Sequence, residues 1–88
     1  MTLAEIKTAL RNGQYAWPGG YPLYFIASDG EALSFKAVRE NWREIVSAHL
    51  RGDKTGGWLI EGVNANWEDP HLFCAHTSER IESAYAEE

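Results

Sequence analysis

The chain begins with a helical pattern of apolar and polar positions. Apolar residues from Leu3 to Leu10 recur every three or four positions, and this spacing predicts a helix over residues 3–12. Thr2 and Glu5 match the Thr-x-x-Glu capping box that begins many helices. A glycine follows the predicted helix, at the position where helices commonly end.

A second helical pattern covers residues 35–51. Ser34 precedes it as a candidate N-cap, and a glycine follows it. Its apolar positions share one helical face, so we expect this face to pack on a sheet through Trp42 and Ile45. The apolar positions are Phe35, Val38, Trp42, Ile45, Val46 and His49 or Leu50.

Short apolar runs between turn residues predict the strands. These runs cover residues 23–27, 31–34, 58–66 and 71–76. The Asp-Gly pair at positions 29–30 separates the first two runs and is a strong hairpin signal. The run over 58–66 is the longest and nearly continuously apolar, so we expect it to form the central strand.

The order of the elements predicts the fold class. Residues 81–85 fit either a last strand or a short helix. We expect an α+β fold with a single small domain over residues 1–88, a mostly antiparallel sheet of about four or five strands, and two helices on one face. A domain of this size has a thin core, to which we expect Trp42 and Trp58 to contribute.

Residues 15–22 read Tyr-Ala-Trp-Pro-Gly-Gly-Tyr-Pro. The prolines exclude a helix, and the aromatic content does not fit a solvated linker. We therefore expect an ordered aromatic loop that either packs on the core or faces a partner. Trp17 and Tyr21 are its candidate partner-binding residues.

Acidic residues are concentrated in the last third of the chain. Residues 1–60 contain seven Lys or Arg and six Asp or Glu, whereas residues 61–88 contain one Lys or Arg and seven Asp or Glu. Phosphate binding needs clustered basic residues, so this balance disfavours direct contact with nucleic acid and favours a basic protein partner. An ordinary solvated surface is the alternative. The acidic candidates for partner binding are Glu61, Glu68, Asp69, Glu79 and Glu82.

The predicted turn over residues 66–70 places an indole beside two carboxylates. Trp67 is followed by Glu68 and Asp69, and then by a proline. An exposed Trp with an acidic rim is typical of a protein-binding hot spot. In the alternative interpretation, Trp67 folds back onto the sheet and Asp69 fixes the turn.

Cys74 and His76 are two residues apart, so on a strand their side chains would point to the same side. His71, or His49 from the long predicted helix, could join them at a metal ion, and a Cys–His nucleophilic dyad is a further alternative. We expect instead a buried thiol and a half-exposed imidazole, with no metal, cofactor or catalytic residue. A single Cys excludes an intramolecular disulfide and predicts a cytoplasmic location.

Several of these segments together resemble a family of small uncharacterised proteins from phages, prophages and plasmids. The resemblance covers most of the chain, and it is carried by residues 15–26, 28–30, 32–35, 66–70, 74, 76–77 and 80–85. It implies no chemistry for any residue, but it implies a mobile-element context. That context is similar to the one of anti-CRISPR and other anti-defence inhibitors, several of which occupy nucleic-acid-binding surfaces.

These observations favour a non-enzymatic inhibitor in the cytoplasm of the host cell. We expect it to bind the basic surface of a nucleic-acid-handling defence complex, such as a CRISPR effector, through an acidic patch with aromatic anchors. We expect no direct nucleic-acid or membrane binding, and a monomer or weak homodimer. A structural or oligomerising protein of the mobile element is the alternative, and a small metal- or thiol-dependent activity is the third hypothesis.

Overall fold

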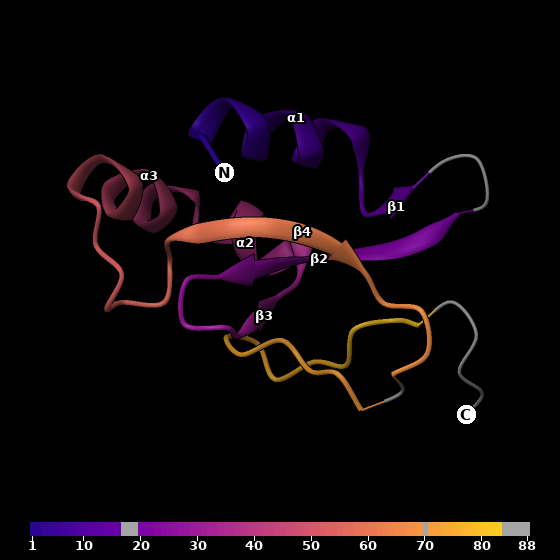
Figure 1. The fold of residues 1–88 in the computed structure, drawn as a ribbon. Helices are drawn as coiled ribbons and strands as arrows, with labels where there is room; N and C mark the ends of the chain where they lie inside the picture. The colour runs from indigo at the N-terminus through magenta and orange to yellow at the C-terminus, as the bar shows by residue number, and fades with distance from the viewer. Residues whose placement is uncertain (17–19, 70, 84–88) are drawn as a thin grey trace.

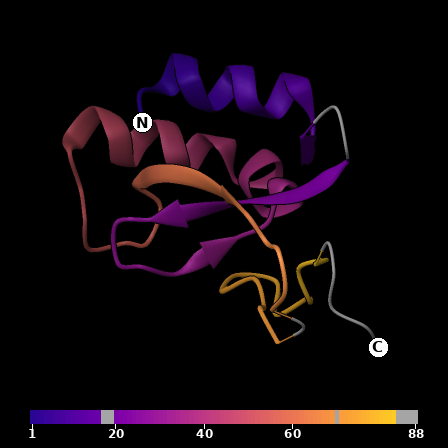
Figure 2. The ribbon, with the colours of Figure 1, turned by 45° about the vertical axis from the view of Figure 1, so that its right-hand side comes forward.

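The computed structural model describes residues 1–16, 20–69 and 71–83. In this part of the chain, three helices and a four-stranded antiparallel sheet form an α+β fold, the class that the sequence predicts. The elements are α1 (Leu3–Asn12), β1 (Tyr15–Ala16), β2 (Tyr21–Ala27), β3 (Ala32–Leu33), α2 (Phe35–Glu40), α3 (Trp42–Arg51) and β4 (Ile60–Ala65). In the view of Figure 1, α1 lies above the strands and α2 lies behind them, and the chain that follows β4 lies below them, as Figure 2 also shows.

The predicted capping box begins α1. The Thr2 hydroxyl oxygen accepts a hydrogen bond from the Glu5 N–H at 3.1 Å, and the Glu5 carboxylate accepts one from the Thr2 N–H at 2.7 Å. These hydrogen bonds hold the pKa of Glu5 below its usual value. The helix ends at Gly13, whose φ of 92° is unfavourable for other residues.

β2 is the central strand, because β1, β3 and β4 all pair with it antiparallel. The expectation of a central strand over residues 58–66 is therefore wrong. β4 pairs only with β2 among the described strands, and Ile60 is its one buried residue. Of this long apolar run, Ile60 is buried in the core and Trp58 is partly buried against it, whereas most of β4 is not buried.

The two ends of the aromatic segment form a strand pair instead of a loop. Tyr15 lies opposite Pro22, and Ala16 lies opposite Tyr21. The structure therefore replaces part of the expected loop with the ends of β1 and β2, while Trp17 lies outside the described residues. The hairpin predicted at residues 29–30 is confirmed: Ala27 donates its N–H to the Glu31 carbonyl at 2.9 Å across the turn.

The single helix predicted over residues 35–51 is divided at Asn41. Ser34 caps the first part as expected, and its hydroxyl accepts the Ala37 N–H at 3.1 Å. At Asn41 the backbone leaves the helical region, with φ −114° and ψ 31°. The Asn41 side-chain amide donates to the Ala37 carbonyl at 2.9 Å. The same carbonyl also accepts the Asn41 N–H at 3.1 Å, so backbone and side chain of Asn41 together end α2 at this carbonyl.

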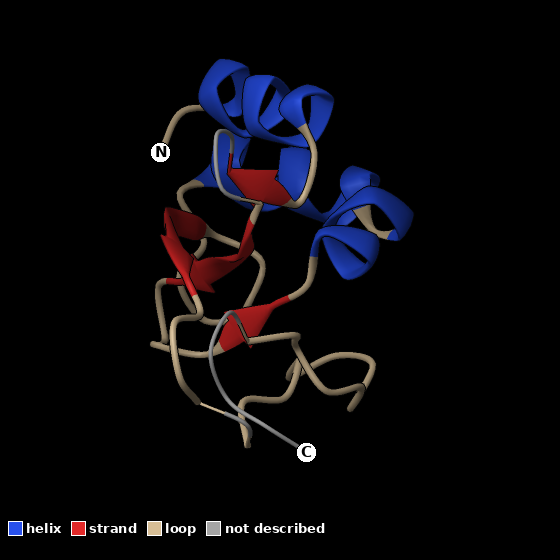
Figure 3. Ribbon diagram, turned by 90° about the vertical axis from the view of Figure 1, so that its right-hand side faces the viewer, coloured by secondary structure: helices blue, strands red, loops and turns tan. Residues whose placement is uncertain are grey.

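The expected strand over residues 71–76 is not present. This part of the chain pairs only through an isolated bridge between Phe73 and Arg80. Residues 81–83 are neither strand nor helix, and the rest of the expected element at 81–85 lies outside the described residues. Figure 3 shows these irregular loops at the end of the molecule opposite the helices.

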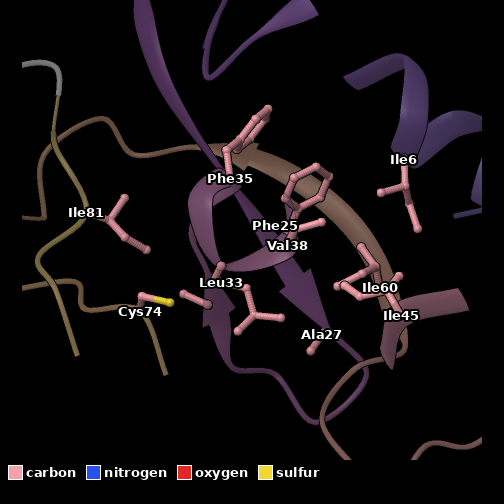
Figure 4. Packing of buried hydrophobic residues seen from close by; sticks show 12 residues of the cluster. Ile6, Phe25, Ala27, Leu33, Phe35, Val38, Ile45, Ile60, Cys74 and Ile81 are labelled. Atoms are coloured by element: carbon pink, nitrogen blue, oxygen red, sulfur yellow. The ribbon is translucent and has the colours of Figure 1, made fainter. Parts of the chain in front are cut away.

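The core extends from the helices through the sheet to the irregular segment (Figure 4). Trp42 and Trp58, both expected in the core, are only partly buried and pack against its margin. Ile45 is fully buried, as its position in the helical pattern predicts. The described core residues are Ile6, Phe25, Ala27, Ala32, Leu33, Phe35, Ala37, Val38, Ile45, Ile60, Cys74 and Ile81.

Candidate protein-binding site at one end of the sheet

An aromatic pair, formed by half-buried Tyr21 and exposed Trp67, lies where β2 begins and β4 has just ended. The rings of Tyr21 and Trp67 have centroids 4.5 Å apart and are tilted by 58°, a favourable geometry for aromatic contact. Trp67 is nevertheless 46% exposed. The sequence left two interpretations of Trp67 open, and the structure combines them: the indole packs on Tyr21 and also presents a large apolar surface.

Asn66 fixes the backbone beside this pair. Its own N–H donates to the Pro22 carbonyl at 2.9 Å, which continues the pairing of β4 with β2 by one residue. Its side-chain amide donates to the carbonyls of Asp69, Ile81 and Glu82 at 3.0, 3.2 and 3.1 Å. Asn66 is only 4% exposed, so these contacts satisfy a buried polar group.

The Asn66 contacts bring three carboxylates to the same end of the sheet. Glu68 and Asp69 follow Trp67 directly, and both are exposed. Glu82 approaches from the irregular segment, and its carboxylate accepts a hydrogen bond from the Tyr15 hydroxyl at 3.3 Å. We call this group the acidic–aromatic site; its members are Tyr15, Tyr21, Trp67, Glu68, Asp69 and Glu82.

Two of the predicted acidic residues are not free members of this site, one because of its position and one because of its ion pair. Glu61 is at the start of β4, and Figure 1 shows that this end of the strand is remote from the Trp67 end. At about 3.3 Å per residue, the strand separates its two ends by roughly 16 Å. Glu79 pairs with Lys36 at 3.5 Å, which partly neutralises it. The expected acidic residues therefore do not form one continuous patch.

A small pocket adjoins the acidic–aromatic site. Its cavity volume is about 250 Å³, and it lies between the start of β2, the start of α2 and the irregular segment. Glu79 and Glu82 both line it, opposite Lys36. The pocket is lined by both carboxylates and cations, so its charge favours neither an anionic nor a cationic ligand.

Cys74 and His76 have different surroundings, contrary to the expectation that they share one side of a strand. Cys74 is buried, and its sulfur accepts the Ser34 N–H at 3.4 Å. Burial raises the pKa of the Cys74 thiol, but hydrogen bonds with Thr77 and Ser34 outweigh this effect and hold the pKa below its ordinary value. His76 is exposed and its ring lies 5.0 Å from that of Trp58.

His49 also has a local structural role, because it accepts a hydrogen bond from the backbone of β4. Its Nε2 atom accepts the Ile60 N–H at 2.9 Å, where β4 begins. Burial lowers the pKa of His49, and the positive N-terminal amino group lowers it further. His49 therefore does not join Cys74. Within residues 1–16, 20–69 and 71–83, no three His, Cys, Asp or Glu side chains are grouped as metal ligands.

Comparison of the chain with protein-family models, curated proteins and solved structures finds no match. Among the residues that the structure describes, no helix combines the length and the apolar character that crossing a membrane requires. The acidic–aromatic site is thus characterised by its own geometry. Its organising residue, Asn66, was not singled out from the sequence, because a buried amide and an ordinary turn asparagine look alike there.

Proposed function

We propose that the protein is a non-enzymatic inhibitor that binds a host protein through the acidic–aromatic site. The observation that carries the proposal is the Tyr21–Trp67 pair, which presents a half-exposed indole on a backbone fixed by Asn66. Aromatic anchors on a rigid support supply most of the affinity at protein interfaces. The pair gives such an anchor without a large loss of conformational entropy on binding.

The carboxylates around the pair select the class of partner. Glu68 and Asp69 are exposed next to Trp67, and neither is in an ion pair within the described part of the chain. They face a partner whose Lys and Arg side chains normally contact phosphates, as in a nucleic-acid-handling defence complex such as a CRISPR effector. Charge complementarity of this kind accelerates association and rejects acidic partners. The resemblance to mobile-element proteins supports the same class of target.

Co-purification with candidate defence complexes tests the proposal. The wild-type chain is compared with Glu68→Lys, and with Glu61→Lys as a matched control that has the same charge change at the remote end of β4. We expect Glu68→Lys to abolish capture at low salt and Glu61→Lys to retain it. Capture of the wild type should weaken as the salt concentration rises. Equal capture of the two variants contradicts the assignment of the site.

Trp67→Ala tests the aromatic anchor and requires a folding control, since Trp67 also packs on Tyr21. We expect a folded variant that no longer binds. Light scattering distinguishes the alternative of an oligomerising protein, because that function predicts a stable homo-oligomer that is insensitive to salt. If the wild type forms such an oligomer and Trp67→Ala dissociates it, this result contradicts the inhibitor proposal.

A further inference from the structure

A second surface of opposite character lies between the helices. Lys7, Leu10 and Arg11 of α1, Arg39 of α2 and Trp42 of α3 line a groove with a cavity volume of about 430 Å³. Leu10 and Trp42 are partly buried against the core and form an apolar floor. The three cations are exposed around this floor. We call this feature the basic groove.

Helix geometry and one hydrogen bond build the basic groove. Lys7, Leu10 and Arg11 are three and four residues apart, so they share one face of α1. Arg39 donates from Nη2 to the Leu10 carbonyl at 2.8 Å, which fixes its guanidinium opposite that face. Since a guanidinium has five N–H donors, others remain for a ligand.

The charges of the groove are not neutralised within the described chain. The ion pairs among residues 1–16, 20–69 and 71–83 are Lys36–Glu79 and Arg51–Asp53, and neither includes a groove cation. The whole chain has a net charge of −5. Three basic side chains gathered around an apolar floor on an acidic protein therefore form a local surface of the opposite sign, which favours an acidic occupant.

We propose that the basic groove binds an acidic amphipathic helix of a partner protein. Apolar side chains of this helix cover Leu10 and Trp42, and its carboxylates contact Lys7, Arg11 and Arg39. The binding of an amphipathic helix in a groove is a common mode of peptide recognition. This inference is independent of the acidic–aromatic site, which involves other residues and a partner of the opposite charge.

Two other occupants fit the groove less well. Single-stranded nucleic acid requires a continuous track of cations, whereas this groove has three cations and the chain as a whole repels phosphates. A second copy of the chain would have to supply an acidic helix. In its acidic part, residues 61–88, the described residues 61–69 and 71–83 are strand or irregular, so these residues do not provide one.

An amide NMR titration of the full chain tests the proposal. The probe is a synthetic helical peptide with Leu on one face and Glu on the other, and the control peptide has Lys in place of Glu. We expect the acidic peptide to shift the signals of Lys7, Leu10, Arg11 and Arg39 and the indole N–H of Trp42, and the basic peptide to leave them unchanged. The same response to both peptides, or no response at these residues, overturns the proposal.

A matched pair of charge reversals locates the binding surface. Arg11→Glu should weaken binding of the acidic peptide by about tenfold, because it replaces an attraction with a repulsion at an exposed site. Lys54→Glu changes the net charge equally in the exposed chain between α3 and β4, and it should leave the affinity unchanged. Equal losses in both variants would show a nonspecific charge effect and overturn the assignment.

Two further NMR experiments test the other two occupants: a titration with oligothymidine, and a concentration series of the protein alone. Stronger shifts of the groove signals with oligothymidine than with the acidic peptide would show a nucleic-acid site instead. Shifts of the same signals on concentrating the protein alone would show that a second copy occupies the groove. Either result replaces the partner helix as the occupant.

Discussion

The side-chain amide nitrogen of Asn66 lies 3.2 Å from the carbonyl oxygen of Ile81. This contact joins the residue that follows β4 to a segment fifteen positions further along the chain. The same amide also reaches the carbonyls of Asp69 and Glu82. One buried side chain therefore holds together the turn that presents Trp67 and the segment that contributes Glu82.

Replacement of Asn66 should destabilise the whole domain. Asn66→Ala removes the donor from three carbonyls and leaves them in a poorly solvated place, so we expect a loss of about 2–3 kcal/mol in the free energy of unfolding. Asn66→Asp should lose at least as much, because a carboxylate would face the same carbonyl oxygens. Urea denaturation measures both. If the loss in the free energy of unfolding is as small as for a typical surface substitution, Asn66 does not organise the end of the sheet that carries Trp67 and Glu82.

The domain should lose stability in mildly acidic solution through His49. The folded-state pKa of His49 is lowered, so the unfolded chain takes up the proton first as the pH falls. The contribution of His49 is complete above its unfolded value of about 6.5 and is lost as the pH falls towards the folded-state pKa. Thermal unfolding between neutral and mildly acidic pH measures this effect.

His49→Gln provides the control for that pH dependence. Glutamine has an oxygen that can accept the Ile60 N–H and has no proton to gain in this range. We expect the variant to show a flatter dependence of stability on pH than the wild type. Parallel curves for the two proteins would assign the pH dependence to other groups.

Two glycines should respond oppositely to substitution by alanine. Gly52 ends α3 with φ 65°, and a Cβ there meets no atom within 4 Å, so Gly52→Ala introduces backbone strain alone. We expect a loss of roughly 1–2 kcal/mol. Gly62 in β4 has no positive φ and also has open space, so Gly62→Ala should gain about 0.4–1 kcal/mol. Urea denaturation of the pair reveals whether the signs differ.

Trp67 should contribute less to folding than a core aromatic residue. Trp67→Ala removes its contact with Tyr21, but nearly half of the Trp67 surface is already exposed, so we expect a loss of about 1–2 kcal/mol. Phe25 is fully buried against Phe35, and Phe25→Ala should lose about 3–5 kcal/mol. Comparable losses measured by urea denaturation would identify Trp67 as mainly structural and weaken its role as a binding anchor.

Features that depend on neighbouring residues were predictable from the sequence. The capping box at Thr2 and Glu5 and the turn at residues 29–30 are formed by groups close in the chain, so their patterns determine their structures. The division of the long helix at Asn41 was missed, because the apolar pattern continues across it. The break coincides with an Asn41 side chain that bonds to the Ala37 carbonyl, a local contact that the spacing of apolar residues does not reveal.

The candidate site was predictable only in part, because it depends on contacts between distant segments. Trp67 and its two acidic neighbours could be singled out locally. The position of Glu82 beside Tyr15 depends on how the irregular segment returns to the sheet. The expectation that Glu61 and Trp67 belong to one patch is wrong. The two residues are close in sequence, but the extended strand β4 between them keeps them apart in space.

The irregular chain after β4 has a further consequence for motion. Its described part is attached to the rest by the burial of Cys74 and Ile81 and by separate polar contacts, among them those of Asn66, the Cys74–Ser34 contact and the Tyr15–Glu82 hydrogen bond, rather than by a strand ladder. Segments with few such attachments open at a lower free energy than the sheet they cover. Native-state hydrogen exchange should therefore divide the amides into a slow class in β2 and a faster class here, and a bound partner should slow the faster class.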